Sequence, residues 1–266
     1  MIIKFIMIAV SIFLLAVFMT MVGKGGGNFY ILILVMAGTA MHQAATTGQF
    51  ILFSASASAL IIFHKYEKVL WPVAILIGVS TSLTAFLGGF FSHEFSSLTL
   101  KMIFTFLLFS TGIIMLLPLS YNKKIPPDNN KGYWTVRMKK KEYIINLWVV
   151  IPLTMLIGFA AGMCGVSGGS FLVPLMVLGC GLPMHIAVGT ATTLIAATAV
   201  MGFIGHAIQG DFNPGLAIPL AVITIIGGII GGKRALSTRP KHLKQLFAFT
   251  NIAAALFMFI HLLKIN

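Results

Sequence analysis

Acidic residues are scarce in this sequence, since only 5 of its 266 residues are Asp or Glu and all charged residues together amount to 9%. A chain with so few charges has too little polar surface to cover a core in water. The mean hydropathy of +1.01 and the hydrophobic content of 58% agree with that shortage. The composition therefore excludes an ordinary soluble domain and predicts a protein that is embedded in a lipid bilayer.

The few acidic residues lie in loops or at the ends of apolar stretches, and they are Glu67, Glu94, Asp128, Glu142 and Asp211. No carboxylate interrupts the middle of an apolar stretch, so the usual carboxylate relay for protons and the usual carboxylate seat for a cation are missing. A cationic substrate is therefore not expected. The 18 Lys and Arg fall mainly in loops, where orientation in the membrane explains them more simply than nucleic acid does.

Cysteine is scarce as well, and Cys164 and Cys180 both lie in apolar sequence, as small buried side chains do. The sequence has no disulfide framework, no cluster of metal ligands, no His-Glu-x-x-His, no Gly-x-Ser-x-Gly and no P-loop. We therefore expect no enzyme, no cofactor and no metal. A sulfur relay through the two cysteines stays open as an alternative.

Long apolar stretches are abundant, and eight of them reach the roughly 20 residues that a helix needs to cross a bilayer. They are residues 3–22, 43–63, 70–91, 98–119, 144–164, 186–208, 214–230 and 243–263. The first stretch has no convincing cleavage site and runs directly into a repeated motif. We therefore expect the first helix of the mature protein there, and not a signal peptide.

The repeated motif divides the chain into two related parts. GKGGGNFYILILVMAGTAMHQAATT starts at Gly23, and GVSGGSFLVPLMVLGCGLPMHIAVGT starts at Gly165. The glycines align without a gap, one extra residue then enters the second copy, and the pattern Met-His-x-Ala-x-x-Thr closes both. The sequence therefore predicts two halves built on one plan.

A short apolar segment follows each glycine run, at residues 28–41 and at residues 170–184. Each is too short to cross the ~30 Å bilayer core as a regular helix, so it either crosses a recessed region or re-enters on one side. Crossing is favoured by the positive-inside rule, because five crossings in each half place most of the Lys and Arg on one side. An odd number of crossings inverts the second half relative to the first, as in many secondary transporters.

We therefore predict an all-α polytopic membrane protein of two inverted repeats, each with four full transmembrane helices and one short or broken helix after a glycine-rich turn. Residues 1–119 form the first membrane repeat and residues 144–266 the second. Residues 120–143 form a basic cytosolic linker that can rest on anionic lipid head groups. Both termini then face outward from the cell inner membrane.

The glycine runs are candidates for a binding site. Glycine lets the backbone approach a ligand closely, and the helix that follows presents unpaired N–H groups and the positive end of its dipole. Two such ends, facing each other in an inverted repeat, form an anion site. Glycines also serve close packing alone, and the cluster at residues 227–232 is expected to do so. Lys24 is either an anion ligand or a cation that snorkels to the interface.

The two histidines at matching positions, His42 and His185, are each followed by threonines. They either cap helices or donate hydrogen bonds to an oxyanion, with a His taking up a coupling proton. The candidate substrate-binding residues are Lys24, Gly25, Gly26, Gly27, Asn28, His42, Thr46, Thr47, Ser167, Gly168, Gly169, Ser170, His185, Thr190 and Thr193.

The glycine runs resemble those of the TauE/SafE family, also called the sulfite exporter family. The resemblance covers nearly the whole chain, and the second copy, GMCGVSGGSFLVPLMVLGCGLPMHIAVGTATT, fits the family pattern closely. The first copy departs from it at Lys24 and at Leu32, which stands where the second copy has Pro174. The resemblance implies a transporter of sulfur-containing anions such as sulfite or organosulfonates, commonly an exporter.

The residues and the resemblance together predict a secondary transporter of small anions that works by alternating access, with the bilayer as its surroundings and protons as a candidate coupling ion. Only the resemblance indicates that the transported anion contains sulfur. An anion channel with the same site and a structural subunit of a larger assembly remain as alternatives.

Overall fold

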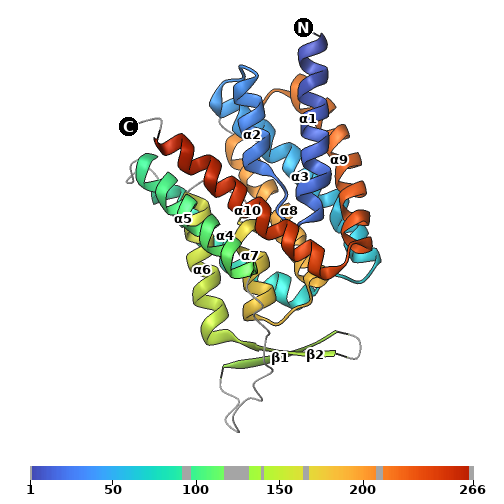
Figure 1. Ribbon diagram of the computed structural model, residues 1–266, viewed down its shortest axis with the longest axis vertical. Helices are drawn as coiled ribbons and strands as arrows, with labels where there is room; N and C mark the ends of the chain where they lie inside the picture. The colour runs from blue at the N-terminus through green and yellow to red at the C-terminus, as the bar shows by residue number, and fades with distance from the viewer. Residues whose placement is uncertain are drawn as a thin grey trace. The chain divides into compact units, whose positions relative to one another are not determined.

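The computed structural model describes residues 2–91, 97–116, 132–138, 141–163, 168–207 and 212–263. Its described elements are mostly helical (Figure 1). They are α1 (Ile2–Met21), α2 (Gly27–Met36), α3 (Met41–Lys65), α4 (Trp71–Phe91), α5 (Ser97–Leu116), β1 (Tyr133–Met138), β2 (Lys141–Asn146), α6 (Leu147–Met163), α7 (Gly169–Pro174), the π-helix η2 (Leu175–Gly179), α8 (Met184–Ala207), α9 (Pro214–Ser237) and α10 (Pro240–Leu263).

A helix covers most of each of the eight predicted apolar stretches, and these helices are α1, α3, α4, α5, α6, α8, α9 and α10. Within the described residues, 4 stretches are long and apolar enough to cross a membrane: Ile3–Met21, Thr46–Lys65, Met184–Ile204 and Pro214–Ser237. Several other apolar helical segments are shorter. The chain is a multi-pass helical membrane protein, while four full crossings in each half and the inversion between halves stay predictions.

The helices form two compact units. The first unit comprises Met1–Val69 and Val188–Thr238, and so contains α1, α2, α3, most of α8 and α9. The second unit comprises Leu70–Ala187 and Arg239–Asn266, and contains α4, α5, the two strands, α6, α7, η2 and α10. Each unit therefore combines helices from both predicted halves of the sequence.

The internal repeat is also seen in the first residues of the helices, which correspond between the two halves. The starting residues that correspond in the repeat are Gly27 of α2 and Gly169 of α7, Met41 of α3 and Met184 of α8, Trp71 of α4 and Pro214 of α9, and Ser97 of α5 and Pro240 of α10. From the second pair onward the spacing between counterparts stays constant. The sequence repeat is thus also a repeat of helix order and helix boundaries.

Helix packing inside the two units follows the same correspondence. In the first unit α1 packs against α9 and the two run side by side (Figure 1), and in the second unit α6 packs against α4. Both contacts are close because of glycine: a Cβ on Gly227 would lie 2.7 Å from the Ala16 Cβ, and a Cβ on Gly158 would lie 2.8 Å from the Thr81 Cα. The prediction that the glycines at 227–232 serve packing is confirmed for Gly227.

The extra residue of the second half sits in the short helix after the glycine turn. In the first half α2 is a regular α-helix of 10 residues. In the second half α7 ends at Pro174 and continues as the π-helix η2, so the two together hold one residue more than α2. A π-helical turn accommodates an added residue without ending the helix. The predicted short helix in the first half and broken helix in the second are both confirmed.

The basic linker contains a β-hairpin, which corrects the all-α prediction. Strands β1 and β2 pair antiparallel, with Val136 opposite Tyr143 and Trp134 opposite Ile145. Alternate side chains on this face are buried, so the period of two that marks a half-buried strand is present in a segment we interpreted as a polar connector. Because β2 runs to Asn146, helix α6 begins at Leu147, later than the predicted apolar stretch.

Candidate functional site

The first glycine turn connects α1 to α2 inside the first unit. Gly23, Gly25 and Gly26 have φ angles of 76°, 71° and 84°, which lie in the left-handed region that side chains disfavour. Gly26 is the N-cap of α2, and no side chain caps it. The first N–H groups of α2 therefore have no intrahelical partner and face outward from the helix end.

The turn is held between α3 and α8, with no room for side chains. A Cβ on Gly25 would lie 2.5 Å from the Leu52 Cδ1 and 2.8 Å from the Ile195 Cγ2. A Cβ on Gly23 would lie 3.1 Å from Val188. The backbone of the turn is thus in van der Waals contact with α3 on one side and α8 on the other.

Lys24 carries the only charged side chain of this turn. Its side chain is only 6% exposed. A buried ammonium is costly unless its charge is compensated. The interpretation of Lys24 as an interfacial, snorkelling cation does not fit this burial, and its alternative role as an anion ligand stays a prediction.

Two buried hydroxyl groups lie against the turn without a hydrogen-bond partner in the described part of the chain. The Ser56 Oγ on α3 lies 3.4 Å from where a Gly25 Cβ would be, and the Tyr30 Cζ, which bears the hydroxyl, lies 3.3 Å from where a Gly26 Cβ would be. Ser56 is 1% exposed and Tyr30 is fully buried. Buried polar atoms are normally hydrogen-bonded, so two orphaned hydroxyls at one turn require an explanation such as a bound ligand or water.

Thr192 on α8 is placed toward the same turn. Val188, Thr192 and Ile195 follow the spacing of one helix face, and the first and last of them contact Gly23 and Gly25. The Thr192 hydroxyl donates to the Val188 carbonyl at 2.8 Å and keeps its oxygen as an acceptor. Together with Lys24, Ser56 and Tyr30 it makes this turn a polar cluster inside an apolar unit.

The cluster combines one cation with O–H donors and a helix N-terminus, in surroundings that exclude water. The ammonium, the two unpartnered hydroxyls and the helix N-terminus complement a small anion, because each can present a full or partial positive charge to it. The Thr192 hydroxyl does not add to this set, since it already donates to the Val188 carbonyl. The set does not suit a cation, since no carboxylate among the described residues is part of it.

The other predicted site residues of the first unit are buried, yet they occupy different helix faces. Thr46 and Thr47 lie on α3 and Thr190 and Thr193 on α8, and the first three are fully buried. At roughly 100° per residue, none of them lies on the face that carries Leu52 and Ser56 or the one that carries Val188 and Thr192. By this spacing, the four hydroxyls do not lie on the helix faces that contact the turn.

The second glycine turn lies in the second unit. Gly168 is the N-cap of α7 with φ 67°, Gly169 opens the helix, and both are buried. Ser170 follows, and its carbonyl oxygen accepts a hydrogen bond of 3.2 Å from the Asn251 Nδ2 of α10. His185 is the second residue of α8 and is half-buried.

Three predicted site residues fall partly or wholly outside the described residues. The backbones of Asn28 and His42 belong to α2 and α3, but their side chains are not described. Ser167 is outside the described residues altogether, as is Cys164, one of the two cysteines considered for a sulfur relay. The other, Cys180, is buried at the end of η2.

Sequence reasoning did not single out Ser56, Tyr30 or Asn251. A signal for Ser56 was present, because Ser54, Ser56 and Ser58 place small polar residues in the middle of an otherwise apolar stretch. Tyr30 and Asn251 offered no such pattern. Their relevance follows from which side chain faces which turn, and only the packing of the helices decides that.

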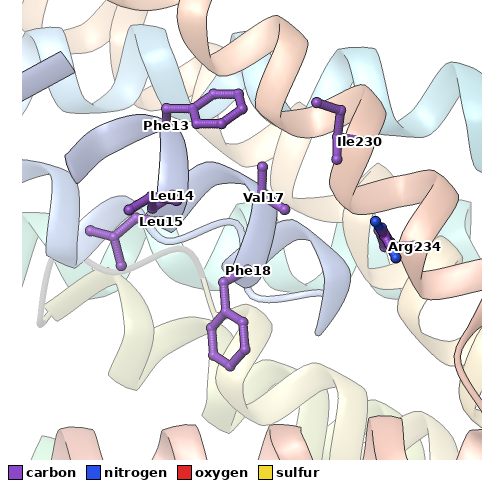
Figure 2. A pocket seen from close by; sticks show the side chains of 7 residues that line it. All are labelled: Phe13, Leu14, Leu15, Val17, Phe18, Ile230 and Arg234. Atoms are coloured by element: carbon purple, nitrogen blue, oxygen red, sulfur yellow. The ribbon is translucent and has the colours of Figure 1, made fainter. Parts of the chain in front are cut away.

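An open groove on the first unit has a different character (Figure 2). It is lined by Phe13, Leu14, Leu15, Val17 and Phe18 from α1 and by Ile230 and Arg234 from α9. Several of these side chains are exposed, as Leu14 is at 60%. An exposed apolar wall is expected where a helix faces acyl chains, so this groove is not a candidate for binding a small anion.

Comparison with known proteins agrees with the architecture. The family model described as sulfite exporter TauE/SafE matches residues 8–258. A probable membrane transporter protein of Xylella fastidiosa strain 9a5c is 26% identical over 244 residues, which cover 88% of this chain and 87% of that protein.

Two relatives come from Bacillus subtilis strain 168. The probable membrane transporter protein YunE is 24% identical over 226 residues, covering 80% of this chain and 81% of its own. The probable membrane transporter protein YdhB is 22% identical over 228 residues, covering 85% and 89%. No solved structure matches the chain.

The family match extends over nearly all of the described helices, including both glycine turns and the helices that surround them. A membrane transporter also accounts for the apolar helices and for the internal repeat. The chain belongs to the TauE/SafE sulfite exporter family of membrane transporters.

Proposed function

We propose that this protein is a secondary transporter of small anions, in particular sulfur-containing oxyanions or organosulfonates, and that it exports them by alternating access. One observation carries the proposal: Lys24 is buried on a glycine turn where Ser56 and Tyr30 hold hydroxyl groups without a partner among the described residues. A cation with two free O–H donors in apolar surroundings suits a small oxyanion. The description of the family as sulfite exporters supports a sulfur-containing anion as the substrate.

The second glycine turn is proposed as the corresponding element of the second half. Gly168 and Ser170 repeat the positions of Gly26 and Asn28, and the helix boundaries repeat with them. We propose that the two halves are inverted, with five crossings each, because that arrangement puts most Lys and Arg on one side. The basic linker is then cytoplasmic, and both termini lie outside the cell inner membrane.

Proton coupling through histidine is part of the proposal, since the apolar stretches hold no carboxylate relay. Its test is uptake into proteoliposomes across an imposed pH gradient, with His42 and His185 both replaced by Gln. Coupled transport loses its response to the pH gradient in this double variant. An unchanged response removes histidine from the coupling step.

The main test replaces Lys24 by Gln in the full chain and measures uptake of radiolabelled anions by the purified, reconstituted protein. The panel comprises sulfite, thiosulfate, taurine, sulfoacetate and chloride. We expect saturable transport of at least one sulfur anion, and a roughly 10- to 100-fold loss in the variant, because a charge-assisted hydrogen bond contributes about 1.5–3 kcal/mol.

The matched control is Lys65→Gln, which removes an exposed cation at the end of α3. This variant is expected to transport at the wild-type rate. If no anion of the panel is transported by purified protein, the proposed function is wrong. Flux that never saturates indicates a channel in place of a transporter.

A further inference from the structure

The broken helix of the second half has a gap in its backbone hydrogen bonding. Proline has no N–H, so Pro174 cannot donate to the carbonyl oxygen four residues before it, which belongs to Ser170. That carbonyl lies one residue after the start of α7, at the second glycine turn. An unsatisfied carbonyl buried in an apolar unit is destabilising, so it requires a substitute donor.

Asn251 of α10 supplies that donor. Its Nδ2 donates to the Ser170 carbonyl oxygen at 3.2 Å and to the Thr111 Oγ1 of α5 at 2.8 Å. Thr111 in turn donates to the Leu107 carbonyl at 2.9 Å, which fixes the direction of the chain of hydrogen bonds. Asn251 is fully buried, and its Nδ2 group makes both of these bonds.

The first half lacks both members of this pair. The repeat aligns Pro174 with Leu32 and Asn251 with Leu108. At Leu32 the helix keeps its backbone N–H, so α2 is regular and no side-chain donor is needed. Leu108 is buried in an apolar cluster with Phe171 and Ala255. A proline and an asparagine on different helices therefore occur together in one half, and two leucines occur in the other.

We infer that Asn251 is a positioning residue for the second glycine turn: it donates the hydrogen bond that Pro174 cannot, and so fixes α7 relative to α5 and α10. The second turn then depends on a side-chain hydrogen bond from α10, whereas the regular helix after the first turn needs no such donor. The effect on stability stands without any assumption about transport, and only the effect on turnover rests on the proposed function.

The test is a double-mutant cycle in the purified full chain, with Asn251→Leu, Pro174→Leu and the double variant. Leucine has nearly the shape of asparagine but leaves the Ser170 carbonyl without a donor. We expect Asn251→Leu to lower the thermal midpoint by roughly 3 to 8 °C. In the double variant the leucine that replaces Pro174 brings a backbone N–H, which restores the missing donor, so most of this loss is recovered. The matched control is Ser110→Ala on α5, whose exposed hydroxyl only bonds its own helix.

A local readout separates positioning of the turn from global stability. Cys180 is fully buried at the end of η2, so its labelling by N-ethylmaleimide, mapped by peptide mass spectrometry apart from Cys164, reports opening of the broken helix. Labelling of Cys180 becomes several-fold faster in Asn251→Leu and returns toward the wild-type rate in the double variant. Turnover of the transported anion falls roughly 10-fold and recovers in parallel.

Two outcomes overturn the inference. One is additivity, in which Asn251→Leu lowers the midpoint by the same amount whether Pro174 is present or has been replaced by leucine. The other outcome applies if Asn251→Leu alone does not fold. We then expect the double variant to be as stable as Pro174→Leu, and a lower thermal midpoint of the double variant contradicts the pairing. Both are measured without substrate, so they are independent of whether the proposed transport is found.

Discussion

The two glycine turns share their sequence plan but differ in what stabilises them. The first turn leads into a regular helix, α2, and contains a buried lysine. The second leads into a helix that changes from α to π geometry at Pro174 and receives a hydrogen bond from Asn251. The comparison shows that two halves of a repeat can keep the same helix boundaries and still differ in their hydrogen bonding. A buried backbone carbonyl needs a donor, and that donor can be a backbone N–H or a side chain.

The two turns also differ in charge and in helix geometry. Lys24 gives the first turn a positive charge, and Ser56 and Tyr30 hold hydroxyls without a partner among the described residues. The second turn has a π-helical segment and a side-chain hydrogen bond, and such features are easier to rearrange than a regular helix. If the proposed function holds, we expect the first turn to bind the anion and the second to move during transport.

The largest expected effect concerns the close packing of the first turn. Gly25→Ala combines a left-handed backbone with a methyl group placed 2.5 Å from the Leu52 Cδ1, and we expect a destabilisation of about 4 kcal/mol. The yield of folded protein and its thermal midpoint measure this.

Gly38→Ala is the matched control for that variant. Gly38 also has a positive φ, 93°, but its added methyl group would meet only the Lys4 Nζ at 4.0 Å. It should cost about 1–2 kcal/mol, which is the backbone term alone. Equal losses at the two positions would show that α3 and α8 do not confine the first turn.

Introducing the proline of the second turn into the first has the next largest effect. Leu32→Pro removes a backbone donor from α2, and its counterpart of Asn251 is the apolar Leu108, so we expect a cost of about 3 kcal/mol or more. Thermal unfolding of the purified variant checks it, with Leu32→Ala as the control for loss of side-chain contacts. A tolerated proline would mean that the first half has another way to satisfy the freed carbonyl.

Much of the helical architecture could be predicted from the sequence, because helix positions follow from apolar length and the repeat follows from the aligned glycines. The extra residue in the second half was visible as an alignment gap, and the structure shows it as a π-helical turn. The hairpin was missed because its alternating Val136, Tyr143 and Ile145 stand among lysines and prolines that are typical of a connector. The grouping of helices from both halves into each compact unit was also not predicted.

The candidate site was predicted only in part, for a physical reason. Lys24 and the glycines are consecutive, so one stretch of sequence identifies them together. The residues that complete the cluster, Ser56 and Thr192, depend on how α3 and α8 are rotated about their axes. A helix that is apolar nearly all round carries no polar stripe to reveal that rotation. The predicted threonines near the histidines therefore lie on the same two helices as Ser56 and Thr192 but on different faces.

The smallest expected effect separates binding from folding at the first turn. Ser56→Ala and Tyr30→Phe remove hydroxyls that have no partner among the described residues, so stability should stay within about 0.5 kcal/mol of wild type or increase. If these hydroxyls donate to the anion, each variant weakens its apparent affinity by roughly 2- to 10-fold. Uptake measured against anion concentration gives both the affinity and the maximal rate.

The control for these hydroxyls is Ser58→Ala, two residues along α3. Ser58 is also buried, but its Oγ donates to the Ala55 carbonyl at 2.8 Å and lies against Gly228 of α9, away from the glycine turn. Its loss should leave anion affinity unchanged, because the Ser58 hydroxyl faces α9 and already has a hydrogen-bond partner. An equal loss of affinity at Ser56 and Ser58 would mean that α3 affects transport through its packing, and the first turn would then lose its assignment as the binding element.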